Sequence, residues 1–172
     1  MQKIAWGFTG AGHFLEECVD LVVSMRNVDV FLSRAASEVI RMYRLADKVE
    51  QGLCTVFKGR WASTPEVGRF YTGKYRLLVI APATSNSVAK FVYGISDTLI
   101  TNLFAHAGKS RVPVVVLASD VGKAIVSRAP RQVVSVFPRP IDLTNVEKLA
   151  TMERVTVVRS IEELKKCLGF SL

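Results

Sequence analysis

The stretch that decides the fold runs Leu77-Leu78-Val79-Ile80-Ala81-Pro82-Ala83-Thr84-Ser85-Asn86-Ser87. Its first five residues are all apolar with no polar alternation, which is typical of a strand covered on both faces of a sheet. Pro82 lacks a backbone N–H, so we expect strand pairing to stop there. The hydroxyl and amide side chains of 84–87 then stand at the start of a helix-like segment, beside free backbone N–H groups. This arrangement can hold a phosphate or the edge of a heteroaromatic ring.

A second loop of this kind, Thr9-Gly10-Ala11-Gly12-His13, follows the apolar run 4–8 near the N-terminus. Glycines let backbone N–H groups approach an anion closely, although a tight turn without a ligand would also use them. The dinucleotide fingerprint is incomplete, because Leu15 stands at its third glycine position and Ser33-Arg34 replaces the acidic residue after the second strand. NAD is therefore disfavoured. Two such loops on one sheet still indicate a nucleotide-like ligand.

Apolar strand-like runs alternate with helical patterns along the whole chain. Such a βαβ series predicts an α/β fold with a three-layer, doubly wound, mostly parallel sheet of the Rossmann-like or flavodoxin-like kind. Ligands of this fold bind at the carboxyl ends of the strands. With 172 residues, 49% of them hydrophobic, the chain 1–172 is expected to form a single domain. The strand-like runs are 4–8, 28–32, 77–81, 112–118, 133–137 and 155–158.

The middle of the chain carries clear helix boundaries. Gly94 is expected to interrupt the helix that begins near Ser87, and the next helix is expected to span 95–107. Gly108 fits the C-cap of that helix. The segment 52–75 is the least periodic part of the chain, and we interpret it as a flap or a contact surface.

Further polar residues are predicted at strand ends on the same edge of the sheet. Ser33 ends the second strand and Ser37 sits one helical turn further on, where hydroxyl and N–H groups could hold a phosphomonoester. Ser33 also fits a plain helix N-cap. Asp120 follows the run 114–119, where it can touch a ligand or cap the following turn. His13 stands at a helix N-terminus, so the helix dipole is expected to keep its imidazole neutral.

Composition excludes several classes of function. Lys and Arg outnumber Asp and Glu by 23 to 15, but the basic residues are dispersed, which disfavours nucleic acid and fits an acidic redox partner or an anionic cofactor. Metal-ligand spacing, a Ser/His/Asp arrangement and a carboxylate pair are all lacking, so we expect no metal and chemistry carried by a cofactor. Isolated cysteines and the lack of a signal peptide or an 18-residue apolar run predict a cytoplasmic protein with no membrane association.

Four motifs spread along the chain carry a family resemblance: Ile4–His13, Ala81–Lys90, Gly94-Ile95-Ser96-Asp97, and Pro140-Ile141-Asp142-Leu143 together with Val146-Glu147-Lys148-Leu149. With them the chain resembles the flavoprotein family that includes the flavin-containing cysteine decarboxylases, and within it the archaeoflavoprotein branch. The resemblance covers nearly the whole length. The second motif looks like that family's Pro-Ala-Ser-Ala-Asn-Thr signature, and the third looks like its Gly-Ile-Ala-Asp helix.

The resemblance implies noncovalent FMN and a homo-oligomer built from trimers, with the flavin near subunit boundaries. Carried over by position, the residues that would line the phosphate and ribityl region are Gly10, Ala11, Gly12 and Ser33. Those that would contact the ribityl chain and the ring edge are Thr84, Ser85, Asn86 and Ser87, and those that would approach the isoalloxazine are Ala118, Ser119 and Asp120. The candidate cofactor-binding set is completed by Thr9, His13, Arg34 and Ser37.

One departure from the family pattern separates the possible functions. The decarboxylases carry a Pro-x-Met-Asn-x-x-Met-Trp element where this chain reads Leu117-Ala118-Ser119-Asp120-Val121-Gly122-Lys123, and their catalytic histidine has no clear counterpart here. The leading hypothesis is therefore an FMN-binding oxidoreductase that takes electrons from a small acidic carrier such as ferredoxin. A pterin reductase similar to dihydromethanopterin reductase is the close alternative. A non-redox decarboxylase, a prenyltransferase or a nucleotide-binding module is the third, and no catalytic residue is assigned.

Overall fold

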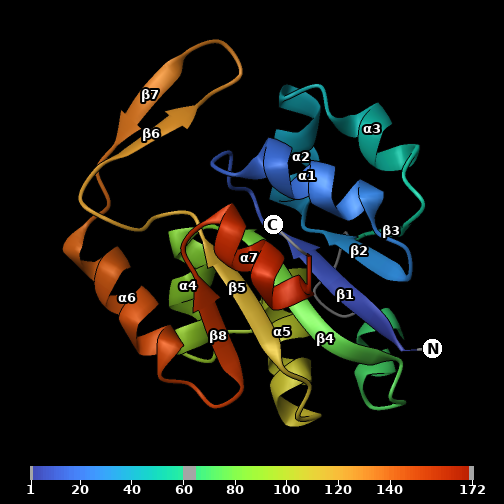
Figure 1. The fold of residues 1–172 in the computed structure, drawn as a ribbon. Coiled ribbons are helices and arrows are strands. Elements are labelled where there is room, and N and C mark those ends of the chain that lie inside the picture. Colours follow the sequence, from blue (N-terminus) through green and yellow to red (C-terminus); the bar gives the residue numbers. More distant parts are fainter. Residues whose placement is uncertain (1, 60–64, 171–172) are drawn as a thin grey trace.

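The computed structural model describes residues 2–59 and 65–170. Its centre is a six-stranded parallel sheet with the strand order β3-β2-β1-β4-β5-β8 (Figure 1). The chain order reverses between β1 and β4, so the topological switch point of this doubly wound sheet lies between these two strands. The strands are β1 (Lys3–Phe8), β2 (Val28–Leu32), β3 (Thr55–Lys58), β4 (Tyr75–Ala83), β5 (Val114–Ala118) and β8 (Val155–Val158).

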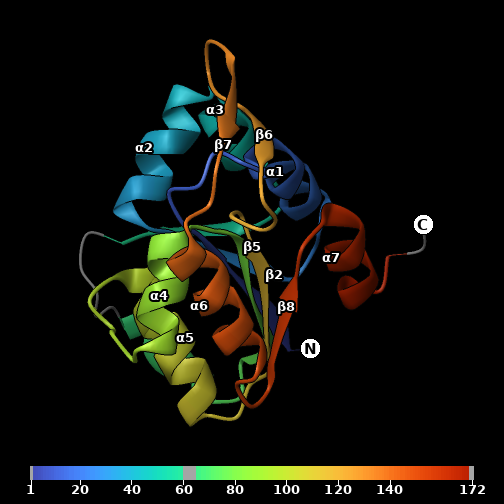
Figure 2. The same cartoon turned by 90° about the vertical axis from the view of Figure 1, so that its left-hand side faces the viewer.

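Helices cover both faces of the sheet, which gives the three predicted layers (Figure 2). Successive side chains of a strand point to opposite faces, so Trp6 belongs to one core cluster and its neighbour Ala5 to the other. The first cluster contains buried residues of α1 (Leu15–Ser24), α2 (Arg34–Met42), α3 (Ala46–Glu50) and α7 (Ile161–Leu168). The second contains those of the 3-10 helix η1 (Pro65–Phe70), α4 (Ser85–Val92), α5 (Leu99–Lys109) and α6 (Pro140–Ala150).

The strand β4 is longer than the sequence predicts. It continues through Pro82 to Ala83, which pairs with Ala118 of β5 after a shift of register. Pro82 cannot donate a hydrogen bond, but its carbonyl accepts hydrogen bonds from both the backbone N–H and the hydroxyl of Thr9. The expectation that pairing stops at Pro82 is wrong because only the donor is missing there.

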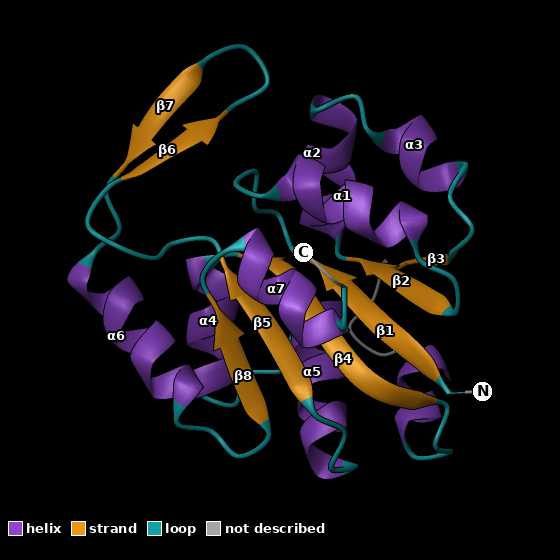
Figure 3. Ribbon diagram, viewed as in Figure 1, coloured by secondary structure: helices purple, strands orange, loops and turns teal. Residues whose placement is uncertain are grey.

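The expected strand 133–137 is present but lies outside the parallel sheet. It forms β7 (Val133–Val136), which pairs antiparallel with β6 (Ile125–Arg128) in a separate hairpin. Figure 3 shows this hairpin beyond the carboxyl ends of the central strands. Parallel pairing needs a crossover of a dozen or more residues, usually a helix, and the structure has none between β5 and β7. The alternating pattern predicted the strand correctly but its sheet wrongly.

The boundaries of α5 also differ from the prediction. The helix begins at Leu99 because Thr98 caps it, with the Thr98 hydroxyl accepting a hydrogen bond from the N–H of Thr101. At the other end the helix runs through Gly108, and the residue with positive φ is Arg111. Gly108 is therefore not the cap. The stretch 94–98 between α4 and α5, expected to be helical from residue 95, is a connection between the two helices.

The segment 52–75 contributes more regular structure than its composition indicates. It supplies β3 at the edge of the sheet and η1 against the second core cluster, while residues 60–64 lie outside the described part. Its interpretation as a flap is wrong for β3, which is hydrogen-bonded along its length to β2. Within the described residues, no helix has the length and apolarity that crossing a bilayer requires.

A buried carboxylate stabilises the sheet between β2 and its neighbours. The side chain of Asp29 is fully buried, and it accepts hydrogen bonds from Lys3 at 2.6 Å and from the Tyr75 hydroxyl at 2.8 Å, with Lys74 at 3.0 Å. Burial by itself raises the pKa of Asp29, but the hydrogen bonds from Lys3, Tyr75 and Lys74 outweigh it and hold the pKa below its ordinary value.

The Asp29 cluster predicts a pH-dependent loss of stability in the Asp29→Asn variant. At neutral pH the variant should lose about 3 kcal/mol of unfolding free energy, because the cations around position 29 lose their counter-charge. Because the pKa of Asp29 is lower in the folded protein than in the unfolded chain, its carboxylate contributes fully to the unfolding free energy at pH values above the unfolded pKa of about 3.9. This contribution is lost as the pH falls through the folded pKa. The difference from wild type should therefore shrink below about pH 4 in urea titrations.

The matched control for this measurement is Glu50→Gln, which breaks the exposed pair with Lys58. Exposed pairs contribute little, so this variant should unfold close to wild type. An Asp29→Asn variant as stable as wild type at neutral pH would contradict the assigned role of the cluster.

Candidate functional site

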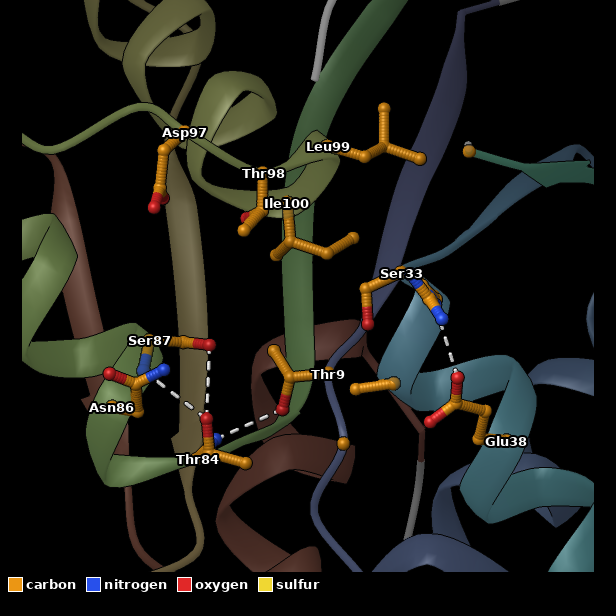
Figure 4. Close-up of a pocket in the computed structure, with 14 residues that line it drawn as sticks. Thr9, Ser33, Glu38, Thr84, Asn86, Ser87, Asp97, Thr98, Leu99 and Ile100 are labelled. Atoms are coloured by element: carbon orange, nitrogen blue, oxygen red, sulfur yellow. Dashed lines mark hydrogen bonds and ion pairs between the residues drawn. The ribbon is translucent and has the colours of Figure 1, made fainter. Parts of the chain in front are cut away.

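A cavity of about 560 Å³ opens at the switch point, between the carboxyl ends of β1, β2 and β4 (Figure 4). We call it the switch-point pocket. Its volume is in the range of small-molecule and cofactor sites, and its position is where doubly wound sheets bind their ligands. The lining residues are Thr9, Gly10, Ser33, Arg34, Ala35, Glu38, Gly59, Thr84, Asn86, Ser87, Asp97, Thr98, Leu99 and Ile100.

Thr9 ties the two sides of the switch point together. Its hydroxyl donates a hydrogen bond to the carbonyl of Pro82 at 2.8 Å and accepts one from the backbone N–H of Thr84 at 3.0 Å. The residue is only 2% exposed. Because both bonds of this hydroxyl are directed to the protein, Thr9 positions the loops that surround the pocket.

At the start of α4, the groups available to a ligand are mainly side chains and not backbone N–H groups. Thr84 is the N-cap, and its hydroxyl oxygen accepts from the N–H of Ser87 while its hydrogen is donated to the Ser87 hydroxyl. The N–H of Ser85 donates to Asp120 Oδ2 at 3.1 Å, and the N–H of Thr84 donates to Thr9. The expected row of free N–H groups at 84–87 is therefore largely used within the protein. The exposed amide of Asn86 and the hydroxyl hydrogen of Ser87 are the polar groups directed to a ligand here.

The start of α2 is better suited to an anion. Ser33 is the N-cap, as predicted, and its hydroxyl oxygen accepts from the N–H of Ala36 at 3.0 Å, so its hydrogen can still be donated. No acidic residue lies in the first turn of α2, and the backbone N–H groups of Arg34 and Ala35 have no hydrogen-bond partner within the described residues. A Cβ on Gly10 would lie 2.8 Å from Cβ of Ala35. The glycine thus permits the close approach of the first loop to this helix end.

Sequence reasoning missed one wall of the switch-point pocket. Asp97, Thr98, Leu99 and Ile100 lie opposite the start of α4, at the beginning of α5 (Figure 4). Asp97 is ion-paired with Lys90 at 2.7 Å, and its pKa is lowered by that hydrogen bond. The Gly-Ile-Ser-Asp motif marked this segment, but the pattern contained no signal that it faces the pocket.

A second polar feature of the pocket was also missed. Glu38, one turn into α2, accepts a hydrogen bond from Arg34 Nε at 3.2 Å. Arg34 was predicted as a cofactor-binding residue and does line the pocket, but its charge is partly used by this pair. The α2 side of the pocket therefore carries one cation and one anion, both exposed.

Most of the other predicted residues line a neighbouring hollow of about 310 Å³, under the β6–β7 hairpin. We call it the hairpin pocket. Thr84 lines both pockets, so the predicted set is divided between two adjacent spaces. Ser37 lines a separate hollow with Ile40, and Ala118 is 1% exposed inside β5, so neither reaches these two pockets. The predicted residues in the hairpin pocket are Ala11, Gly12, His13, Thr84, Ser85, Ser119 and Asp120.

His13 is held neutral by burial. Desolvation lowers its pKa, and the nearby carboxylates of Glu17 and Asp120 raise it by less. The pKa is lowered in the predicted direction, and burial is the largest cause. At the adjacent Gly12, a Cβ would lie 2.2 Å from the hydroxyl oxygen of Tyr43, so a larger residue there requires the Tyr43 side chain to move.

A model of the family described as Flavoprotein matches residues 1–169. The chain belongs to this family. Membership confirms the resemblance inferred from the motifs.

Three relatives of this flavoprotein have informative descriptions. An uncharacterized protein of Methanocaldococcus jannaschii is 38% identical over 176 residues, covering 98% of this chain and 95% of the relative. A dihydromethanopterin reductase (acceptor) of Methanosarcina mazei is 43% identical over 142 residues, covering 75% of this chain and 59% of that enzyme. The crystal structure of Burkholderia xenovorans DmrB in complex with FMN, described as a cubic protein cage for redox transfer, is 45% identical with a TM-score of 0.89. It covers 98% of this chain and 93% of DmrB, which confirms the predicted fold.

The Thr9 link predicts the behaviour of two variants of this flavoprotein. Thr9→Val keeps the shape of the side chain but leaves the N–H of Thr84 without its partner and removes one of the two hydrogen bonds to the Pro82 carbonyl, so we expect a loss of about 2 kcal/mol in unfolding free energy. Thr9→Ser keeps the hydroxyl and should therefore retain most of the unfolding free energy that Thr9→Val loses. Urea unfolding of both variants measures the difference, and equal stability of Thr9→Val and Thr9→Ser would contradict the bridging role.

Proposed function

We propose that this chain is an FMN-dependent oxidoreductase that holds FMN in the switch-point pocket and passes electrons to a separate acceptor. The observation that carries the proposal is the pocket itself, which combines an anion-binding helix end at α2 with a hydroxyl-lined wall at α4 and lies at the switch point. A relative of nearly the same fold is described in complex with FMN. The flavin supplies the redox chemistry, and the residues of the chain bind and orient it.

The phosphate of FMN would lie at the start of α2. The Ser33 hydroxyl and the backbone N–H groups of Arg34 and Ala35 are donors, and Gly10 allows the neighbouring loop to come within contact of this helix end. The positive charge of Arg34 attracts the phosphate, while the negative charge of Glu38 repels it. Several weak contacts of this kind are needed to retain a phosphate without a lysine.

The ring would lie between the starts of α4 and α5. Leu99 and Ile100 supply apolar surface there, and Asn86 and Ser87 supply an amide and a hydroxyl from the opposite side (Figure 4). A mostly apolar wall with a few placed polar groups is the usual lining of a cofactor site. Donors near the pyrimidine edge stabilise negative charge on a reduced ring.

The phosphate assignment predicts that FMN binds about tenfold or more tightly than riboflavin, since several helix-end contacts add up. Glu38→Gln should raise FMN affinity severalfold and leave riboflavin affinity unchanged, because only FMN presents an anion to position 38. Flavin fluorescence titrations measure both constants.

The matched control is Glu153→Gln, an exposed carboxylate outside both pockets. It should leave both affinities as in wild type. Equal binding of FMN and riboflavin, or weaker FMN binding by Glu38→Gln, would show that the phosphate does not lie at α2.

The charge distribution supports an acidic protein such as ferredoxin as the electron donor. Arg34 at the start of α2, Arg128 in β6 and Arg139 at the start of α6 all carry largely exposed guanidinium groups. A formal net charge of +8 adds long-range attraction for an acidic carrier. Such a carrier would reach the cofactor from the edge of the sheet that holds the two pockets.

A pterin reductase is the second candidate, favoured by the similarity to the dihydromethanopterin reductase of Methanosarcina mazei. Anaerobic stopped-flow mixing separates the two functions. We expect reduced ferredoxin to reduce the FMN-loaded protein in a saturable reaction, and a pterin reductase to be reoxidised in a saturable reaction by 6-methyl-7,8-dihydropterin. Reoxidation by the dihydropterin identifies the reductase, and reduction by ferredoxin without that reoxidation identifies the carrier function. Reduction no faster with ferredoxin than without it, together with reoxidation no faster with the dihydropterin than with buffer, would contradict the redox proposal.

We further propose that the chain forms a homo-oligomer built from trimers, as the family resemblance implies. The hairpin supports this proposal because it extends from the body of the fold and exposes large apolar side chains, among them Val126, Val133 and Phe137. DmrB is described as a cubic cage. Analytical ultracentrifugation that finds only monomer would contradict this assembly.

The cytoplasm is the compartment that we propose for this chain. All three cysteines, Cys18, Cys54 and Cys167, lie in the described part and are free. Unpaired cysteines are typical of reducing compartments. A disulfide-linked form in the purified, unreduced cellular protein would contradict this assignment.

A further inference from the structure

The hairpin pocket lies next to the switch-point pocket and is separate from the FMN site proposed above. Thr84 lines both spaces, so a molecule in the hairpin pocket lies beside a cofactor in the switch-point pocket. Its volume of about 310 Å³ suits a small heterocycle. A small-molecule acceptor must lie against the flavin to receive its electrons, and this space satisfies that requirement.

Asp120 supplies a fixed acceptor group in the hairpin pocket. Its Oδ2 atom accepts hydrogen bonds from the N–H of Ser85 at 3.1 Å and from the Ser119 hydroxyl at 3.3 Å. Within the described residues, Oδ1 has no hydrogen-bond partner and the carboxylate forms no ion pair. A carboxylate has about four lone-pair sites, so an oriented Asp120 can accept two further N–H groups.

The hairpin completes the pocket with one polar and several apolar groups. Ser127 is 7% exposed, and its hydroxyl has no partner among the described residues. Ile125, Val134 and Val136 form the apolar wall beside it. A flat ring with a hydrogen-bonding edge matches this combination, since the ring can lie along the aliphatic wall while its edge faces Asp120.

We propose that the hairpin pocket is the acceptor subsite, and that it binds a 2-amino-4-oxopteridine whose amino group and ring N–H are recognised by Asp120. This inference rests on the proposed FMN function and names its acceptor. The pteridine edge presents two adjacent donors, which a carboxylate can accept together. The flavin pyrimidine edge presents one N–H between two carbonyls, which would meet the carboxylate with unfavourable oxygen contacts. Asp120 is therefore assigned to the acceptor and not to the isoalloxazine.

The test uses the FMN-loaded, reduced protein and 6-methyl-7,8-dihydropterin. Asp120→Asn keeps an acceptor for the Ser85 N–H but loses the carboxylate, so the half-saturating concentration of dihydropterin should rise about tenfold or more. Ser127→Ala should raise it severalfold, while FMN content and reoxidation by ferricyanide stay as in wild type. The FMN content of each variant also shows that it has folded.

Two controls make the assignment specific. Ser135→Ala makes the same change on β7 at an exposed position between Val134 and Val136, on the side of the strand that faces away from the pocket, and it should leave dihydropterin binding unchanged. The matching dihydrolumazine has an oxo group in place of the 2-amino group. It should bind wild type more weakly than the dihydropterin does, and this preference should shrink in Asp120→Asn.

The outcomes distinguish this inference from the function on which it rests. Unchanged half-saturation by dihydropterin in both Asp120→Asn and Ser127→Ala overturns the acceptor subsite and leaves the FMN proposal standing. Loss of FMN affinity in Ser127→Ala shows that the hairpin pocket belongs to the flavin site, which also overturns it. Wild-type protein that retains no FMN overturns the proposed function and this inference together.

Discussion

The architecture of the site depends on the hydroxyl of Thr9. β1 and β4 are paired neighbours, but the loops that follow them lead to helices on opposite faces of the sheet, and the backbone pairing ends with the hydrogen bond from the Thr9 N–H to the Pro82 carbonyl. The hydroxyl bonds to the Pro82 carbonyl and the Thr84 N–H continue this connection inside the protein. Once the two loops are held, Gly10 is directed to the start of α2 and Thr84 is placed as the cap of α4. Both walls of the pocket follow from this one buried link.

Stability and binding are located in different parts of the sheet. Asp29 gathers two lysines and a tyrosine in the interior of the sheet and its neighbouring turns, and no residue of this cluster lines either pocket. The carboxyl edge instead has exposed cations and helix starts whose hydrogen-bonding groups are incompletely used. The anion-binding end of α2 and the carboxylate of Asp120 lie in different pockets, so one edge can hold two ligands of opposite hydrogen-bonding character side by side.

The sequence predicted the elements that local chemistry determines. The apolar run before Pro82, the serine cap at position 33 and the polar loop at 84–87 each carry their signal in adjacent residues, and together they sufficed for the fold class and the family. Tertiary relationships had no such signal. The hairpin location of β7, the use of the Ser85 N–H by Asp120 and the approach of Leu99 to the pocket each depend on residues distant in the chain. The sequence therefore predicted a single set of residues, which the structure divides between two adjacent pockets.

The most direct test of this account is a crystal structure of the protein with FMN bound. The account predicts the FMN phosphate at the start of α2 within hydrogen-bond distance of Ser33, the ring between the starts of α4 and α5, and the hydroxyl of Thr9 still bonded to Pro82 and Thr84. A flavin ring that fills the hairpin pocket against Asp120, or a phosphate bound away from α2, would contradict it.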